Sequence, residues 1–417
     1  MVTKPFTVLP LRSHGGPDYR GAAPHDFSTN SNACAPCPLA QAALLQADAS
    51  RYPDASYTRL RRQLADFHQV DTARLVLAAS ASEFIFRITA LAAQMAGLAG
   101  TAGEGGTVWL PPHSYGDYAQ AASAQRLTLT TDPCQAQLLW ACEPSSPLGS
   151  AQAGLAAMAD LREKNAMLAL DRAYEPLRLG GAPSLTQSQL QTVWQLWTPN
   201  KALGLTGVRA AYAIAPVGAE EAVRRLDQLS PSWPVGAHGV AMLRTWLEPA
   251  VQAWLAGSLD MLRDWKARQI ALCESLDWTC MGSEANFFCA RPNLPEGLSL
   301  PQVLDRLRAQ GIQLRDTASF GLPGHVRVSV LPPAAQDALS NAWRQLTGKA
   351  SERLPSLQTV ASAAAEKMTS FQMPDYISRE AALGTSENFD QFLNLASNAP
   401  AEPGDEVFRD IGSIGKK

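Results

Sequence analysis

The chain has 417 residues, of which 35 are basic and 38 are acidic, so its formal net charge is -3. The sequence contains no basic block and no patch in which basic and aromatic residues alternate, which argues against nucleic-acid binding. No apolar run is long enough to cross a bilayer, and the N-terminal stretch lacks the apolar core of a secretory signal, so we expect a cytoplasmic protein without a membrane span. The length exceeds one ordinary hydrophobic core and predicts two or three domains.

Seven cysteines at irregular spacing argue against a disulfide framework, because their number is odd. Cys34 and Cys37 have the spacing of a redox motif, but such a motif should open a helix after a strand, and here the pair lies in a Pro-rich loop. A zinc site would need two more ligands at suitable spacing, and none is apparent nearby. We therefore expect two loop thiols and no bound metal.

The N-terminal segment 1–50 is rich in Gly, Pro and small polar residues, which predicts an extended arm with a short helix near 39–48. A helix over 56–68 follows. From there, short apolar segments alternate with helical patterns, which is typical of a parallel-rich sheet covered by helices on both faces. The strands are predicted at 75–78, 107–110, 127–130, 138–141, 166–170, 192–197 and 208–214. The helices between them are predicted at 82–96, 115–125 and 151–164.

Beyond Pro234 the pattern changes to long helices at 236–247 and 249–273, followed by a smaller α+β unit. The remaining elements of that unit are strands at 277–281, 286–291, 312–315 and 325–330 and helices at 300–309 and 332–346. After Gly348 the composition turns to Ala, Ser, Glu and Pro, which favours a tail or small appendage. The predicted division is an arm (1–50), a large domain (51–245), an interdomain helix with a small domain (246–348), and the tail (349–417).

A lysine, an arginine and a small hydroxyl residue lie close together in Thr198-Pro-Asn-Lys201-Ala-Leu-Gly-Leu-Thr-Gly-Val-Arg209, and Asp171 and Tyr174 precede them by one crossover unit. Pyridoxal phosphate (PLP) chemistry needs such a set: an amine for a Schiff base, a carboxylate for the ring nitrogen, and donors for the ring oxygen and the phosphate. The spacing resembles the Ser-x-x-Lys and Gly-x-Arg motifs of the class I/II aminotransferase superfamily. That resemblance implies that Lys201 carries the cofactor and that Thr198 and Arg209 bind its phosphate.

Asp171 ends an apolar strand, where parallel sheets place ligand groups, although a lone aspartate there is more often a helix cap. With Tyr174 it resembles the family's Asp-x-Ala-Tyr, which implies that the carboxylate pairs with the ring nitrogen and the phenol with the ring oxygen. Ala81 and Ser82 begin a helix, whose N–H groups are suited to phosphate. Capping by a serine is the other reading, and the two roles are compatible.

Further motifs extend the resemblance. Tyr115 matches the tyrosine that stacks on the PLP ring, and Ser146 stands where the family has a ring-oxygen asparagine. In the arm, Asn32 belongs to a segment that lines the active-site entrance, and Tyr52 to an Arg-Tyr-Pro motif that reaches the neighbouring subunit's phosphate. The resemblance therefore implies a homodimer with shared active sites.

Two features bear on the substrate. His14 and Gly15 resemble the opening of the threonine-phosphate decarboxylase group, where they bind a substrate phosphate; an ordinary mobile turn is an equal alternative. Arg327 corresponds to the arginine that clamps a substrate carboxylate, and Arg315 is a second anion-binding candidate. Both lie in a segment that resembles the histidinol-phosphate aminotransferase and threonine-phosphate decarboxylase groups.

The resemblance, over about residues 10–347, implies the PLP fold-type I architecture: a large α/β domain with a mostly parallel seven-stranded sheet, plus a small α+β domain. The first expectation for activity is a threonine-phosphate decarboxylase-like lyase of cobalamin biosynthesis acting through Lys201. The alternative is a histidinol-phosphate-type aminotransferase that transfers an amino group to a 2-oxo acid. A third, motivated by Ser146 and the tail, is a non-catalytic PLP-fold interaction protein. In each enzyme reading the partner is a small amino acid or phosphorylated amine.

Overall fold

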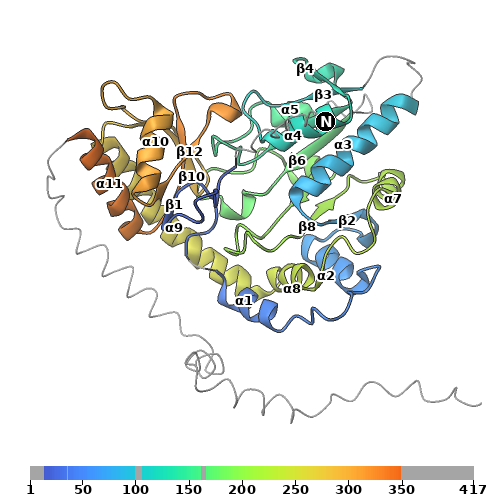
Figure 1. Cartoon of the computed structure of the whole chain (residues 1–417). Coiled ribbons are helices and arrows are strands. Elements are labelled where there is room, and N and C mark those ends of the chain that lie inside the picture. Colours follow the sequence, from blue (N-terminus) through green and yellow to red (C-terminus); the bar gives the residue numbers. More distant parts are fainter. Residues whose placement is uncertain (1–13, 35, 99–105, 161–165, 349–417) are drawn as a thin grey trace, which may run out of the picture. The chain divides into compact units, whose positions relative to one another are not determined.

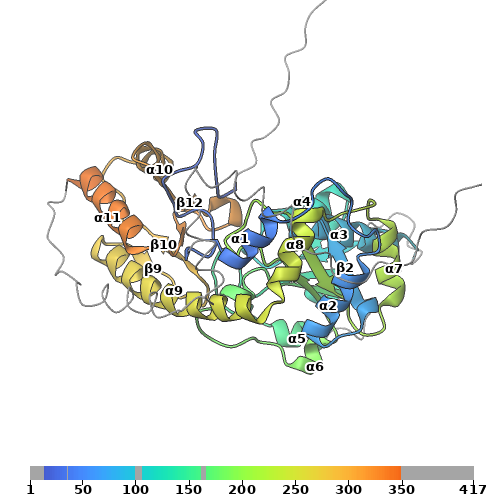
Figure 2. The ribbon, with the colours of Figure 1, turned by 90° about the horizontal axis from the view of Figure 1, so that it is seen from below.

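A computed structural model of the chain describes residues 14–34, 36–98, 106–160 and 166–348 (Figure 1). The predicted tail, part of the arm and the end of the helix expected at 151–164 lie outside these residues. Within them, a large α/β part and a smaller α+β part are joined by the long helix α9, Pro249–Ser275. Figure 2 shows α9 running from beside α8 to beside α11.

The large part is built on a seven-stranded sheet of order β2-β8-β7-β6-β5-β3-β4, in which only β8 runs antiparallel to its neighbours. The mostly parallel seven-stranded sheet expected from the sequence is thereby confirmed. Its strands are β2 Leu75–Ala78, β3 Thr107–Trp109, β4 Thr128–Thr130, β5 Leu138–Cys142, β6 Met167–Asp171, β7 Trp194–Trp197 and β8 Ala211–Ile214. The helices around it are α1 Pro38–Leu45, α2 Thr58–His68, α3 Ala81–Leu98, α4 Gly116–Ala124, α5 Leu155–Asp160, α6 Gln187–Leu190, α7 Glu220–Gln228 and α8 Ala237–Trp246.

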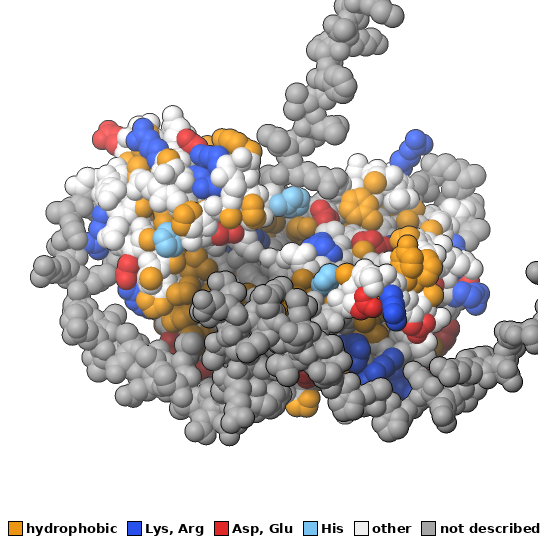
Figure 3. Space-filling model, turned by 60° about the horizontal axis from the view of Figure 1, so that its bottom comes forward, with side chains coloured by type: hydrophobic (Ala, Val, Ile, Leu, Met, Phe, Trp, Pro, Cys, Tyr) orange, Lys and Arg blue, Asp and Glu red, His pale blue; other side chains and the backbone are white. Residues whose placement is uncertain are grey.

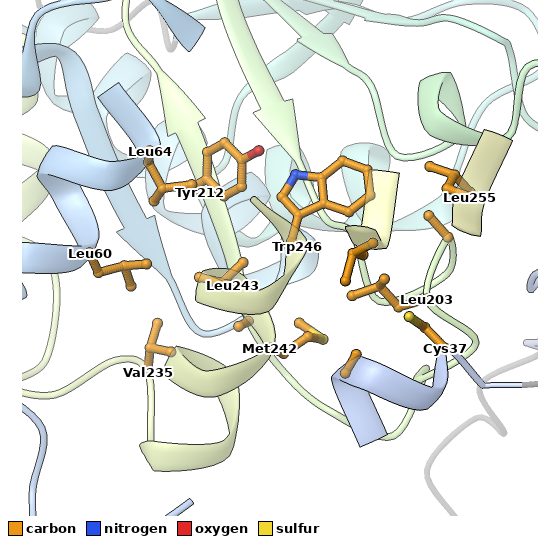
Figure 4. Packing of buried hydrophobic residues seen from close by; sticks show 14 of the residues in the cluster. Cys37, Leu60, Leu64, Leu203, Tyr212, Val235, Met242, Leu243, Trp246 and Leu255 are labelled. Atoms are coloured by element: carbon orange, nitrogen blue, oxygen red, sulfur yellow. The ribbon is translucent and has the colours of Figure 1, made fainter. Parts of the chain in front are cut away.

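The central strands are continuous apolar runs because helices cover both faces of the sheet. All four residues of β2 are buried, and its alternate side chains enter different cores. Val76 and Ala78 pack with α3, α4 and α7, whereas Leu75 and Leu77 pack with α1, α2 and α8. The second of these cores is drawn in Figure 4, where side chains of α2 and α8 surround Tyr212 of β8.

The small part holds a four-stranded antiparallel sheet of order β12-β13-β10-β9, packed against α9, α10 and α11. Its elements are β9 Thr279–Cys280, β10 Phe287–Arg291, α10 Leu300–Ala309, β11 Ile312–Gln313, β12 Arg315–Asp316, β13 Val326–Ser329 and α11 Pro333–Thr347. The arm contributes β1, His25–Asp26, which pairs in parallel with β11. This pairing fixes the arm against the small part and brings it to the edge of the site described below.

Several elements differ from the sequence expectation, and among them the short strand β1 and the helix α6 were not predicted. The strand predicted at 312–315 is divided, because β11 pairs with the arm while β12 pairs with β13. Helix α7 was not predicted, since only two of its side chains, Val223 and Leu226, are buried and the rest of its sequence is strongly charged. On the face shown in Figure 3, basic and acidic side chains of the described residues are interspersed. Within the described ranges, none of the helices combines the length and apolar character that a membrane span requires.

Candidate active site

The carboxylate of Asp171 lies at the carboxyl end of the central strand β6, with 5% of its surface exposed. Its Oδ1 accepts a hydrogen bond from the Ala173 backbone N–H (2.9 Å), and its Oδ2 accepts one from Tyr118 Oη (2.8 Å). Burial raises the pKa of Asp171, while the Lys201 charge and these two donors oppose that rise. These two hydrogen bonds hold the carboxylate in position. Because the group is buried, a neighbouring cation strongly favours its charged form.

Lys201 follows β7 on a turn whose backbone is hydrogen-bonded to the arm. The Asn32 backbone N–H donates to the Lys201 carbonyl (2.9 Å), and Asn32 Nδ2 donates to the Ala202 carbonyl (3.0 Å). The Lys201 amine lies 5.3 Å from the centre of the Tyr174 ring, and within the described part of the chain it forms no hydrogen bond or ion pair. The backbone is thus fixed while the amine stays available for reaction.

Several donors line the same cavity as the carboxylate, and two of them are where α3 begins. Ala81 and Ser82 are its first two residues, so their backbone N–H groups have no acceptor within the helix. Thr198 is buried and donates to Asn200 Oδ1 (2.9 Å). The Arg209 side chain is exposed and makes no ion pair among the described residues. This end of the site is suited to an anion such as a phosphate.

Tyr115 lies at the same end, where its hydroxyl is 3.3 Å from Ser82 Oγ. Burial raises the pKa of Tyr115, so its phenol stays protonated. The His14 ring of the arm lies 6.2 Å from the Tyr115 ring, centre to centre. One aromatic ring and one imidazole therefore line the cavity that also contains Asp171 and Lys201.

The other side of the site is formed by Arg327 of β13, which is 6% exposed. Its Nη1 donates to Ser146 Oγ (3.2 Å) and its Nη2 to the Ser28 carbonyl (3.1 Å), while Nε has no partner. Ser146 is buried in the loop after β5. At the start of that loop, Arg178 forms an ion pair with Glu143 (3.0 Å). An arginine with a free N–H at a cavity wall is a candidate for binding an anionic substrate group.

These groups line one cavity of about 260 Å³. Most of the residues expected from the sequence are brought together here: His14, Gly15, Ala81, Ser82, Tyr115, Ser146, Asp171, Tyr174, Thr198, Lys201, Arg209 and Arg327. Three are not. Asn32 lies beneath the Lys201 turn, Tyr52 is 78% exposed and stacks on Trp233 (4.4 Å), and Arg315 borders a neighbouring cavity.

Further lining residues were not singled out from the sequence. Tyr118 lies three positions after Tyr115, and its role as the donor to Asp171 emerges only from packing. Asn30, two positions before Asn32, lines the cavity, donates to Tyr174 Oη (3.4 Å) and has an unpartnered Oδ1. In a segment without turn or helix periodicity, sequence alone does not tell which of two nearby asparagines faces a cavity. The described residues contain no cluster of three or more His, Cys, Asp or Glu side chains suited to a metal ion.

The donor set matches PLP. The free amine of Lys201, the buried carboxylate of Asp171 and the anion-binding start of α3 are the three groups that PLP requires for its aldehyde, its ring nitrogen and its phosphate. The unpartnered Asn30 Oδ1 and Arg327 Nε leave polar capacity for a ligand in the same cavity.

Comparison with known proteins agrees with this match. The family model described as aminotransferase class I and II matches residues 25–343. A histidinol-phosphate aminotransferase of Jannaschia sp. is 26% identical over 336 residues, which are 75% of this chain and 88% of that protein. The histidinol-phosphate aminotransferase of Sinorhizobium meliloti, solved in complex with PLP, superposes with a TM-score of 0.64 at 21% identity, covering 77% of this chain and 89% of that one.

The L-threonine-O-3-phosphate decarboxylase of Porphyromonas gingivalis has the same fold, with a TM-score of 0.62 at 17% identity over 74% of this chain and 95% of that one. At this identity the likeness concerns the fold alone. The family match spans both the large and the small part and includes the predicted lysine, aspartate and arginines. The chain therefore belongs to the class I and II aminotransferase family, and it is an enzyme that uses PLP as its cofactor.

Proposed function

We propose that the enzyme transfers the amino group of a phosphorylated amine, of the histidinol-phosphate type, to a 2-oxo acid. The observation that carries this proposal is the pair Arg315 and Arg327, which are direct neighbours across β12 and β13. Both side chains border a cavity that adjoins the one containing Lys201. Two guanidinium groups suit a dianionic phosphate better than a single carboxylate. The name of the Jannaschia relative supports the same substrate class.

In this proposal Lys201 would hold the cofactor covalently through Nζ, and its amine would also move a proton at the substrate's Cα. The carboxylate of Asp171 would keep a proton on the ring nitrogen, and Tyr174 would hold the ring oxygen. When bound, PLP supplies an electron sink for the bond that breaks at Cα.

The remaining residues would position the substrate and the cofactor and shield the cofactor ring. Tyr115 covers the ring, and Ser146 holds Arg327 through their hydrogen bond of 3.2 Å. Together, Ala81, Ser82, Thr198 and Arg209 bind the cofactor phosphate.

Decarboxylation of a phosphorylated amino acid is the second candidate. His14 and Gly15 favour it, because they line both the inner cavity and the outer one, where a substrate phosphate would lie. The two reactions differ in which bond of Cα breaks: loss of the proton leads to transamination, and loss of the carboxylate leads to decarboxylation. The orientation that Arg327 imposes on the substrate decides between them.

The holoenzyme tests these alternatives when it is incubated with histidinol phosphate or with O-phosphothreonine, each with and without 2-oxoglutarate. Glutamate formation from histidinol phosphate supports the proposal, and carbon dioxide release from O-phosphothreonine supports the decarboxylase. A cofactor spectrum that responds to neither substrate nor to glutamate would contradict both and favour a non-catalytic protein. Lys201→Ala should abolish covalent PLP attachment, as judged by mass spectrometry after borohydride reduction. The matched variant Lys266→Gln, at a buried lysine outside the cavity, should retain it.

We also propose a homodimer in which Tyr52 of one subunit reaches the phosphate end of the other's site. Tyr52 does not line the cavity of its own chain, is exposed, and stacks on the Trp233 ring. Mixing Tyr52→Ala with Lys201→Ala tests this, because a hybrid dimer would regain one intact site. Sedimentation as a monomer, or no recovery of activity on mixing, would contradict the proposal.

A further inference from the structure

A second cavity of about 250 Å³ adjoins the one that contains Lys201, and it lies between the large and the small part of the enzyme. Tyr115, Ser146, Tyr174 and Arg327 line both cavities, so the two are continuous. A substrate whose amine reaches Lys201 must therefore place its remaining groups in this outer cavity.

The walls of the outer cavity differ in charge. The small part supplies Arg315 and Arg327, together with the Ser319 hydroxyl. The large part supplies Asp117 and Gln120 from the first half of α4. Cationic side chains therefore stand on one side and a carboxylate with an amide on the other, which is an unexpected arrangement for a cavity that binds only an anion.

Asp117 has no cationic partner in the described part of the chain. Asp117 is 8% exposed, and among the described residues its carboxylate forms no ion pair; its one side-chain contact of this kind is a hydrogen bond with the neighbouring Tyr115. Its charge does contribute to the raised pKa of the neighbouring Tyr115 phenol. A buried carboxylate without a cationic partner costs folding free energy, which a ligand can offset by supplying the missing donor.

The position of Asp117 is rigid because α4 is anchored from the opposite side. One residue later, Tyr118 is fully buried, stacks on Trp140 (4.4 Å) and donates to Asp171. Tyr118 thus points to the cofactor end of the site while Asp117 borders the substrate end. The helix can hardly rotate to expose Asp117 to solvent without breaking the contact to Asp171.

We propose that Asp117 is a specificity residue that accepts a hydrogen bond from a nitrogen-bearing group on the substrate's side chain, such as an imidazole N–H or an ammonium. The substrate class is then a phosphorylated or carboxylated primary amine with a second, nitrogen-bearing polar group. Its anionic end binds Arg315 and Arg327, and its nitrogen-bearing end binds Asp117 across the cavity. This inference rests on the proposed function, and it goes further by naming the residue that selects the side chain.

A purely structural role is the competing explanation, because an acidic residue in the first turn stabilises a helix through its dipole. Glu220 provides the matched control, since it occupies the first turn of α7, is exposed and lies outside both cavities. A dipole effect should act alike at both helices and should not depend on the ligand.

The test measures binding of two ligands to the PLP-loaded enzyme by calorimetry: histidinol phosphate and 2-amino-3-phenylpropyl phosphate, whose ring has no N–H group. Wild type should bind the imidazole ligand about 10- to 100-fold more tightly, the value of a hydrogen bond to a charged group. Asp117→Asn and Asp117→Ala should reduce this preference to less than about threefold by weakening only the imidazole ligand. Glu220→Gln should leave the preference intact.

Equal affinities in wild type, absence of binding of either ligand, or an equal loss for both ligands in the Asp117 variants would overturn the inference. The outcome is separable from that of the proposed function, because glutamate formation is measured independently. Transamination without a preference for the imidazole would reject the role of Asp117 alone. A preference without any transamination would reject the proposed reaction and retain the recognition role.

Discussion

Tyr118 and Asp171, 53 residues apart in the chain, are joined by a hydrogen bond of 2.8 Å from the phenol to the carboxylate. This bond connects α4 to the end of β6 and is inaccessible to solvent. Burial raises the pKa of Asp171, and the Tyr118 hydroxyl is one of the groups that counteract the rise. The aspartate proposed to hold the cofactor's ring nitrogen is therefore maintained as a carboxylate partly by a neighbouring tyrosine.

Tyr118→Phe removes this donor while keeping the aromatic stack on Trp140. Because a hydrogen bond to the charged form favours that form, its loss should raise the pKa of Asp171 further and protonate the group at a higher pH. We expect the acid limb of the pH profile of kcat/KM to move to higher pH, with a loss on the order of tenfold below neutral pH. Tyr57→Phe, which loses a buried phenol bond to the Val235 carbonyl outside the site, should not move the limb. An unshifted acid limb in Tyr118→Phe would show that the bond is structural only.

Gly15→Ala should disturb substrate binding through the backbone. A Cβ at this position would collide with the carbonyl of Ser28, and that carbonyl accepts a hydrogen bond from Arg327 (3.1 Å). Displacing the carbonyl should move the arginine, raising KM for an anionic substrate by roughly tenfold with a smaller change in kcat. Gly257→Ala, in the middle of α9 with open space around it, is the matched control and should be neutral or slightly stabilising. Unchanged KM in Gly15→Ala would mean that the arm accommodates the methyl group.

Ser146→Ala tests the residue that we expect to stand in place of the family's ring-oxygen asparagine. The Ser146 hydroxyl accepts a hydrogen bond from Arg327 Nη1, so its removal frees one N–H of a buried guanidinium. We expect KM for the amine substrate to rise by about threefold to tenfold, because the arginine loses part of its orientation. Ser145→Ala, whose hydroxyl bonds Ser150 instead, should leave KM unchanged. If both variants behaved alike, the effect would belong to the loop and not to the contact with Arg327.

The buried Lys266 should make the free energy of unfolding depend on pH. Its Nζ donates to the carbonyls of Ser283 and Ala285, and burial lowers its pKa to about 8 from 10.5. Between these values the unfolded state binds more protons than the folded state, so the free energy of unfolding should rise with pH through this window. The contribution is at most on the order of 3 kcal/mol. Urea unfolding of wild type and Lys266→Met from pH 7.5 to 10 measures it as the difference between the two curves, and curves that stay parallel would contradict the prediction.

Much of the fold follows from local patterns. The segments predicted as strands at 75–78 and 138–141 form β2 and β5, because apolar runs of that length between helical stretches can be buried only in a covered sheet. The same reasoning failed for α7, where two buried side chains in a charged segment give too weak a pattern. It also failed to divide the strand at 312–315, since the two halves pair with segments far away in the chain.

The sequence by itself determined the chemistry: the lysine after β7, the carboxylate at the end of β6 and the arginine on β13 were predicted from residue types at short spacings. Tertiary structure alone decided which of Asn30 and Asn32 lines the cavity, which tyrosine contacts Asp171, and that Asp117 borders the same cavity as two arginines. The physical reason is that reactive groups are specified by covalent sequence, whereas charge complementarity between α4 and the small part depends on packing between segments about 200 residues apart.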